Sequence, residues 1–66
     1  MRIILNGEEK EIEAGLTVAQ LVASCELQPV HVAVEVNQDL VTRKKHDSMT
    51  LKEGDAVEIV TMVGGG

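Results

Sequence analysis

The sequence contains no phenylalanine, tyrosine or tryptophan, and only six of its 66 residues are lysine or arginine. Proteins that bind nucleic acids use cationic side chains to neutralise phosphates, and binding to single strands adds stacking on aromatic rings. With 11 acidic residues, the formal net charge here is −5. The composition therefore argues against nucleic-acid binding. It favours a surface charged for solubility, or a partner with a positive docking face.

Disulfides, leader segments and long apolar runs are also missing. Cys25 is the one cysteine, which fits a reducing compartment and no disulfide scaffold. The apolar runs are far shorter than the ~20 residues of a membrane helix. Met1 leads directly into a strand pattern and not into a secretory leader. We therefore expect a cytoplasmic protein without membrane association.

No constellation of catalytic or metal-binding residues is evident. His31 and His46 lack neighbouring Cys, Asp or Glu at ligand spacing, so we expect no metal site. We interpret Cys25 as a small buried apolar residue and not as a nucleophile, because it falls on the apolar face of a predicted helix. The sequence therefore predicts no catalytic residue on this chain.

The first third of the chain predicts a hairpin followed by a helix. Asn6-Gly7 separates the apolar segment 2–5 from the alternating segment 8–13, the typical signal of a type I′ hairpin turn. The alternation predicts a second strand with one solvent-facing side. Thr17 and Gln20 then form a capping box, and Pro29 prevents the helix from continuing. Its apolar face comprises Val18, Leu21, Val22 and Cys25.

The remaining segments predict strands and turns. The first is an alternating strand at 30–36, whose residues Val30, Val32, Val34 and Val36 are expected to face inward. It is followed by a turn at 37–39, a short strand at 40–41 and a polar surface loop at 42–48. A tight turn at 52–55 then leads into a last strand at 56–63. This order predicts an α+β fold, a mixed sheet of four to five strands with one helix packed across one face. With the first and last strands adjacent in the middle, the arrangement is a β-grasp. Predicted core residues are Ile3, Leu5, Ile12, Leu21, Val22, Val32, Val34, Val57 and Ile59.

The three glycines at 64–66 predict a flexible tail after a β-grasp domain of residues 1–63. Glycine has no Cβ and fits where two backbones approach closely. Three extended residues reach roughly 10 Å, enough to carry the carboxylate of Gly66 into a narrow slot on another protein. Gly64 and Gly65 would then be recognised as bare backbone. A frayed terminus is the alternative interpretation.

Five segments of the chain form a recognisable series: Asn6-Gly7, Gly15-Leu16-Thr17-Val18, the valine strand ending in Asn37, Gly54 to Ile59, and Val63-Gly64-Gly65-Gly66. Together they resemble the ThiS family of sulfur carrier proteins of thiamine biosynthesis, which implies a ubiquitin-like β-grasp fold. The resemblance covers the whole chain, and the order and spacing of the segments carry it. In this chain His46 stands where family members often have an aromatic residue.

The resemblance implies a chemistry for the tail. A ThiF-like adenylating enzyme would use ATP to convert the Gly66 carboxylate into an acyl adenylate. A persulfide sulfur donor would then convert it into a thiocarboxylate (1-thioglycine), whose sulfur goes to a ThiG-like thiazole synthase. The chain would bind no cofactor and would act as a protein co-substrate, not as an enzyme.

A partner surface and two further classes of function complete the predictions. Val57 and Ile59 are expected to face the helix, so Glu58, Val60 and Met62 should face away, forming with Ile4 an exposed patch that could bind partners. Ordinary half-covered sheet residues are the alternative. A carrier for another pathway, such as the small subunit of molybdopterin synthase, or a modifier joined to lysines also stays open, as does a β-grasp interaction module.

Overall fold

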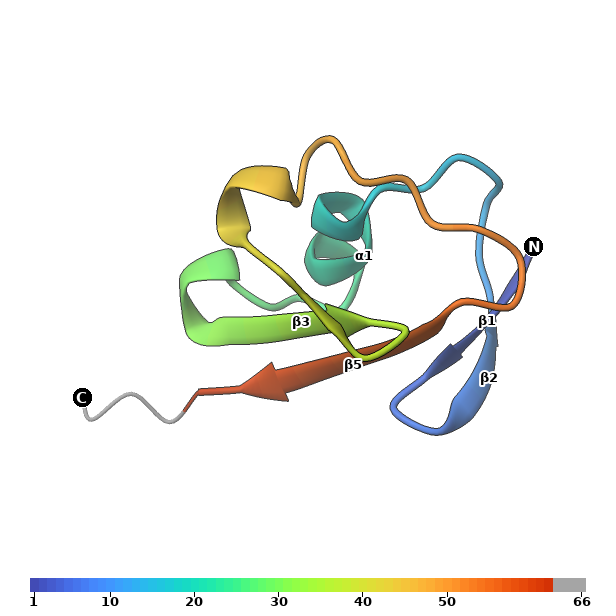
Figure 1. The fold of residues 1–66 in the computed structure, drawn as a ribbon, viewed down its shortest axis with the longest axis horizontal. Coiled ribbons are helices and arrows are strands. Elements are labelled where there is room, and N and C mark those ends of the chain that lie inside the picture. Colours follow the sequence, from blue (N-terminus) through green and yellow to red (C-terminus); the bar gives the residue numbers. More distant parts are fainter. Residues whose placement is uncertain (63–66) are drawn as a thin grey trace.

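A computed structural model describes residues 1–62 and shows a five-stranded sheet with one α-helix packed against it (Figure 1). The strands are β1 (Arg2–Leu5), β2 (Glu8–Glu11), β3 (Val32–Val36), β4 (Asp39–Val41) and β5 (Ala56–Thr61). The helix α1 spans Val18–Ser24, and two short 3-10 helices span Pro29–His31 (η1) and Arg43–Lys45 (η2). The predicted division into a domain at 1–63 and a tail at 64–66 falls partly outside the described residues.

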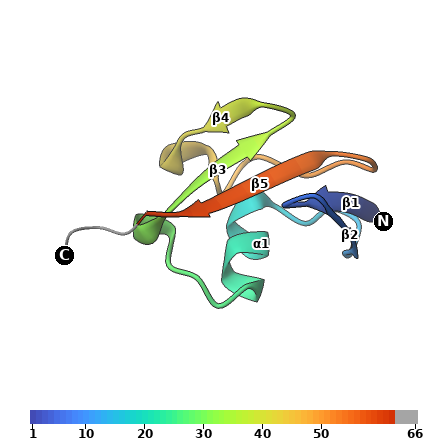
Figure 2. The same cartoon turned by 90° about the horizontal axis from the view of Figure 1, so that it is seen from below.

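The strand order is β2-β1-β5-β3-β4, which places β5 in the centre of the sheet. β5 runs parallel to β1 on one side and antiparallel to β3 on the other. Two parallel neighbours need a crossover connection, and α1 lies within it, against one side of the strands (Figure 2). The predicted mixed sheet with adjacent first and last strands is confirmed.

Both hairpins turn through two residues with positive φ. Asn6 and Gly7 have φ of 50° and 84°, and Asn37 and Gln38 have φ of 53° and 73°. A type I′ turn requires φ > 0 at both central positions. The first turn is therefore as predicted. The second is tighter than the predicted three-residue turn, so that Asp39 already belongs to β4.

The asparagine of the first turn also attaches its hairpin to the central strand. Its Oδ1 accepts a hydrogen bond from the Ile59 N–H at 2.8 Å, and its Nδ2 donates to the Ile59 carbonyl at 3.3 Å. The parallel register itself pairs only two residues of β1 with β5. On the other side of β5, Asn37 Oδ1 accepts from the Ala56 N–H at 3.0 Å. The two turns thus extend the hydrogen bonding of β5 on both its edges.

We expect Asn6→Gly to lower the free energy of unfolding by about 1–2 kcal/mol, because glycine adopts the same φ but leaves the partly buried Ile59 backbone without its partners. Urea denaturation followed by circular dichroism measures the change. Gln38→Gly is the matched control, since it too replaces a residue at positive φ and the Gln38 side chain forms no hydrogen bond within residues 1–62. Equal stabilities of the two variants would contradict the role of Asn6.

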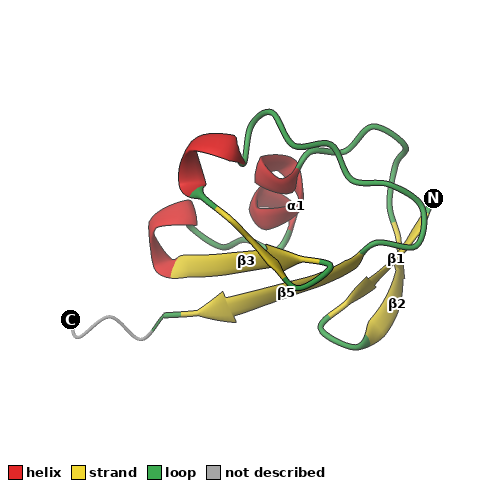
Figure 3. Ribbon diagram, in the orientation of Figure 1, coloured by secondary structure: helices red, strands yellow, loops and turns green. Residues whose placement is uncertain are grey.

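The helix begins as predicted and ends earlier than Pro29. The Gln20 N–H donates to Thr17 Oγ1 at 3.1 Å and the Thr17 N–H donates to Gln20 Oε1 at 2.9 Å, which completes the capping box. The helix ends at Ser24, because the chain adopts positive φ (62°) at Glu26. Pro29 instead begins η1 (Figure 3), which leads directly into β3.

The core lies between the helix and one face of the sheet. Its buried apolar residues are Ile3, Val18, Leu21, Val22, Val32, Val34, Val36, Val41, Leu51, Val57 and Ile59. Of the predicted core, only Leu5 and Ile12 are partly buried instead of buried. The list of predicted core residues omits Val41 and Leu51. The apolar character of the segment 49–51 predicts packing for Leu51, whereas Val41 is buried because β4 pairs with β3, where Val41 lies opposite Val34.

Three further predictions are wrong. Val30 is exposed, because it lies within η1 and the alternation of β3 begins only at Val32. β2 is exposed on both sides and not on one, because it is the edge strand and its partner β1 separates it from the rest of the sheet. Cys25 is only partly buried, at the C-terminal cap of α1.

His46 is the fourth correction. The segment 42–48 was expected to be a surface loop, yet His46 is only 4% exposed. The 3-10 turn of η2 directs its ring inward, where Nε2 lies 3.2 Å from the Val41 carbonyl oxygen. A carbonyl only accepts, so Nε2 carries the proton, while Nδ1 has no hydrogen-bond partner in the described structure. His46 is thus the buried residue of a loop, 42–48, whose other residues are all exposed.

Candidate docking face and carboxyl-terminal tail

The central strand β5 leads directly to the glycine tail. Beyond the strand, the Met62 N–H donates a hydrogen bond to the His31 carbonyl at 2.7 Å, which attaches this end of the chain to η1. Residues 63–66 lie outside the described residues, and with them the predicted roles of Gly64, Gly65 and Gly66. Those roles stay predictions. The described part establishes that the segment before the tail belongs to the middle of the sheet.

The face of the sheet opposite the helix carries the predicted patch. Val57 and Ile59 are buried toward the helix, so the alternating residues of β5 face away. Val60 is 57% exposed, Met62 and Glu58 are exposed, and Ile4 on β1 is half-buried. Ile4 pairs with Ala56 at the start of β5, so the four predicted residues extend along one strand and its neighbour. We call this side of the sheet the outer face.

A groove of 390 Å³ lies on the outer face. Its lining is part apolar, from Ile4, Gly7, Ala56 and Val57, and part polar, from Glu35, Gln38 and Glu58. Sequence analysis included Ile4 and Glu58 in the patch but missed Glu35 and Gln38. The alternation of β3 already placed Glu35 on the face opposite the valines. The alternation could not give the register between β3 and β5, which sets Glu35 directly opposite Glu58.

The ion pairs of the described residues lie on β1 and β2, at the edge of the sheet that β2 forms. Arg2 contacts Glu9 at 3.3 Å and Glu11 at 3.4 Å, and the α-ammonium of Met1 lies 3.2 Å from Glu11. The ammonium, followed by Arg2, lowers the pKa of the Glu11 carboxyl below its usual value. This small stabilisation is present above the ordinary pKa of glutamate and is lost as the pH falls through the lowered one. Within residues 1–62, no such pair involves Glu35 or Glu58.

The ThiS family model matches residues 3–66. The chain belongs to the ThiS family. A crystal structure of the thiamine biosynthesis protein ThiS from Geobacter metallireducens is similar over 100% of both chains, with a TM-score of 0.86 and 33% identity. The sulfur carrier protein ThiS of Bacillus subtilis is 33% identical over 63 residues, covering 94% of this chain and 96% of that protein. The β-grasp fold and the predicted family are both confirmed.

Other relatives of this ThiS-family chain are much longer. A thiazole synthase of Magnetococcus marinus is 41% identical over 66 residues, which is 100% of this chain and 20% of that protein. A thiazole synthase of Paramagnetospirillum magneticum is 35% identical over 66 residues, which is likewise 100% of this chain and 20% of that protein. The chain therefore spans about a fifth of the length of these two relatives. In them, a ThiS-like segment is part of a protein named for the synthase.

Residues 1–62 hold no group of three or more His, Cys, Asp or Glu side chains that could bind a metal ion. None of the helices in the described part has the length and apolar character that crossing a bilayer requires.

Proposed function

We propose that this chain is a sulfur carrier protein of thiamine biosynthesis. The observation that supports this most strongly is the family match over residues 3–66, which includes all three tail glycines. The sulfur carriers among the relatives, and the fold shared with ThiS, support the same conclusion. In this function the chain is not an enzyme, because the reacting groups other than its own terminus belong to partners.

The terminal carboxylate of Gly66 is the group that would react. With a pKa of about 3.3–3.7 it is ionised at neutral pH and is a poor electrophile. A ThiF-like adenylating enzyme would let a carboxylate oxygen attack the α-phosphate of ATP, which releases pyrophosphate and leaves an acyl adenylate. A persulfide sulfur would then displace AMP. Cleavage of the sulfur–sulfur bond by another thiol would leave the thiocarboxylate.

The chain itself supplies reach and recognition. Gly64 and Gly65 present bare backbone to the slot of the adenylating enzyme, where a Cβ would collide. The chain binds no cofactor of its own, since ATP is consumed on the partner. The patch of Ile4, Glu58, Val60 and Met62 docks partner proteins, and methionine suits a surface that must adapt to more than one of them. A thiazole synthase is the partner that receives the sulfur.

Intact-mass measurement tests the proposal. After incubation with ATP, the adenylating enzyme and a persulfide donor, we expect a mass gain equal to the difference between one sulfur and one oxygen atom. Omitting ATP is the control and should abolish the gain. No gain in the complete mixture would contradict the proposal and favour a β-grasp interaction module. If the thiocarboxylate forms but molybdopterin, and not thiamine, rescues a deletion strain, the carrier serves the other pathway.

A further inference from the structure

We propose that the groove on the outer face is a receptor for an arginine side chain of the thiazole synthase. This inference rests on the proposed function, because it assigns part of the docking surface to one partner. The groove of 390 Å³ is lined by both Glu35 and Glu58, which stand directly opposite each other on β3 and β5.

Glu35 and Glu58 are paired in the register of β3 and β5, and within residues 1–62 neither forms an ion pair with a cation. Like charges directly opposite one another on neighbouring strands destabilise a sheet. Both glutamates are exposed. The isolated domain therefore carries an electrostatic repulsion that a cation from outside would convert into an attraction. The net charge of −5 favours the approach of such a partner.

The remainder of the groove suits a long side chain with an apolar stem. Gly7 and Ala56 contribute little side-chain volume, and the half-buried Ile4 offers an apolar surface beside them. Arginine and lysine both bury their methylene stems along apolar surface while keeping the charged end in a polar environment. A guanidinium is planar, has five donors and can bind carboxylates in a bidentate manner, whereas an ammonium is a point charge. Two opposed carboxylates therefore favour arginine.

The surroundings of the groove indicate a protein and not a free small molecule. On β4, Leu40 pairs with Glu35 and is 65% exposed. On β5, Val60 lies two residues after Glu58, opposite Ala33 of β3, and is also exposed. Exposed apolar residues beside a charged groove match the anatomy of a protein interface, with its apolar contacts and charged rim. Among proteins, the thiazole synthase is favoured because two relatives carry a segment like this chain within a synthase chain.

Calorimetric titration with the thiazole synthase of the same organism tests the inference. We expect Glu35→Gln and Glu58→Gln each to weaken binding about 10-fold, because each removes one charge-assisted hydrogen bond. In the double variant, the dissociation constant should rise by less than the product of the two single-variant factors, since both carboxylates contact one guanidinium. The unbound variants should unfold at a higher temperature than the wild type, because the repulsion is gone.

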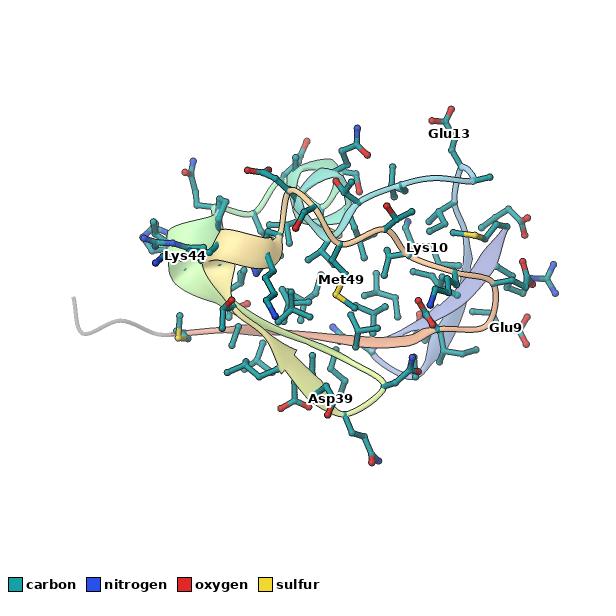
Figure 4. All side chains as sticks on the ribbon, turned by 45° about the horizontal axis from the view of Figure 1, so that its top comes forward. Glu9, Lys10, Glu13, Asp39, Lys44 and Met49 are labelled. Carbon is teal, nitrogen blue, oxygen red and sulfur yellow. The ribbon has the colours of Figure 1, made fainter. Side chains whose placement is uncertain are left out.

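The variant Glu13→Gln is the matched control for each single groove variant. It removes the same charge, and Glu13 extends from the side of the molecule opposite Asp39 and the β3–β4 hairpin (Figure 4). Its binding should stay within a factor of two of wild type. If the groove variants bind as tightly as this control, the inference is overturned. A failed inference and a failed proposed function are distinguishable, because the wild-type chain would still gain sulfur in the intact-mass measurement if only the inference is wrong.

Discussion

Gly65→Ala should reduce adenylation of the tail on the order of 100-fold while leaving the free energy of unfolding unchanged. The added methyl group would enter a slot shaped around bare backbone and displace the Gly66 carboxylate from the α-phosphate of ATP. A misplacement of about 1 Å between reacting groups is enough to cost roughly 100-fold in rate. ATP–pyrophosphate exchange catalysed by the adenylating enzyme measures the loss.

Val63→Ala is the control for this experiment. It alters the residue directly before the glycines but removes atoms instead of adding them, so pyrophosphate exchange should stay near the wild-type rate. A urea denaturation curve for each variant checks that the domain is intact. Normal exchange with Gly65→Ala would show that the glycines are not recognised as bare backbone, and the proposed role of the tail would be wrong.

Leu21→Ala should lower the free energy of unfolding by about 2–5 kcal/mol. Leu21 is 0% exposed and lies on the face of α1 that packs against the sheet. Its truncation removes buried apolar atoms and leaves a cavity. A domain of 66 residues has a total stability of only about 3–10 kcal/mol at roughly 0.05–0.15 kcal/mol per residue. The variant is therefore expected to lose a large share of the total stability of the domain.

Far-UV circular dichroism in increasing urea measures the difference. Leu40→Ala is the matched control, because the same atoms are removed from a side chain that is 65% exposed on the outer face. Its free energy of unfolding should change by about 0.5 kcal/mol or less. A loss in Leu40→Ala as large as that in Leu21→Ala would mean that the outer face contributes to stability. It would then be a poor candidate for a surface kept free for partners.

Local signals account for the predictions that were confirmed. Asn6-Gly7 gave the first hairpin, because few residue pairs adopt φ > 0 twice in succession. Thr17 and Gln20 gave the start of the helix, because their side chains satisfy the first free backbone donors. The alternating valines after Val30 gave the inward face of β3. Each of these signals depends only on residues close together in the chain.

The incorrect predictions have different causes. Val30 continued the alternation of the valines, but η1 begins at Pro29, turns the backbone out of the strand and leaves Val30 exposed. His46 lies in a polar segment, yet its ring is buried with Nε2 beside the Val41 carbonyl oxygen. A local turn thus accounts for Val30, and burial in the tertiary structure accounts for His46. Periodicity reports which face a residue takes within an element, and it cannot report what covers that face.

The sequence alone determined the types of element, their order, the two faces of the central strands and the membership of the ThiS family, because these follow from spacing and turn chemistry along the chain. Only the tertiary structure decided the register that opposes Glu35 to Glu58, the groove beside them and the attachment of Asn6 to Ile59, 53 residues away. These features join separate strands. A shift of one residue between two strands would move every side chain to the other face, and it is the packing of the whole core that selects the register.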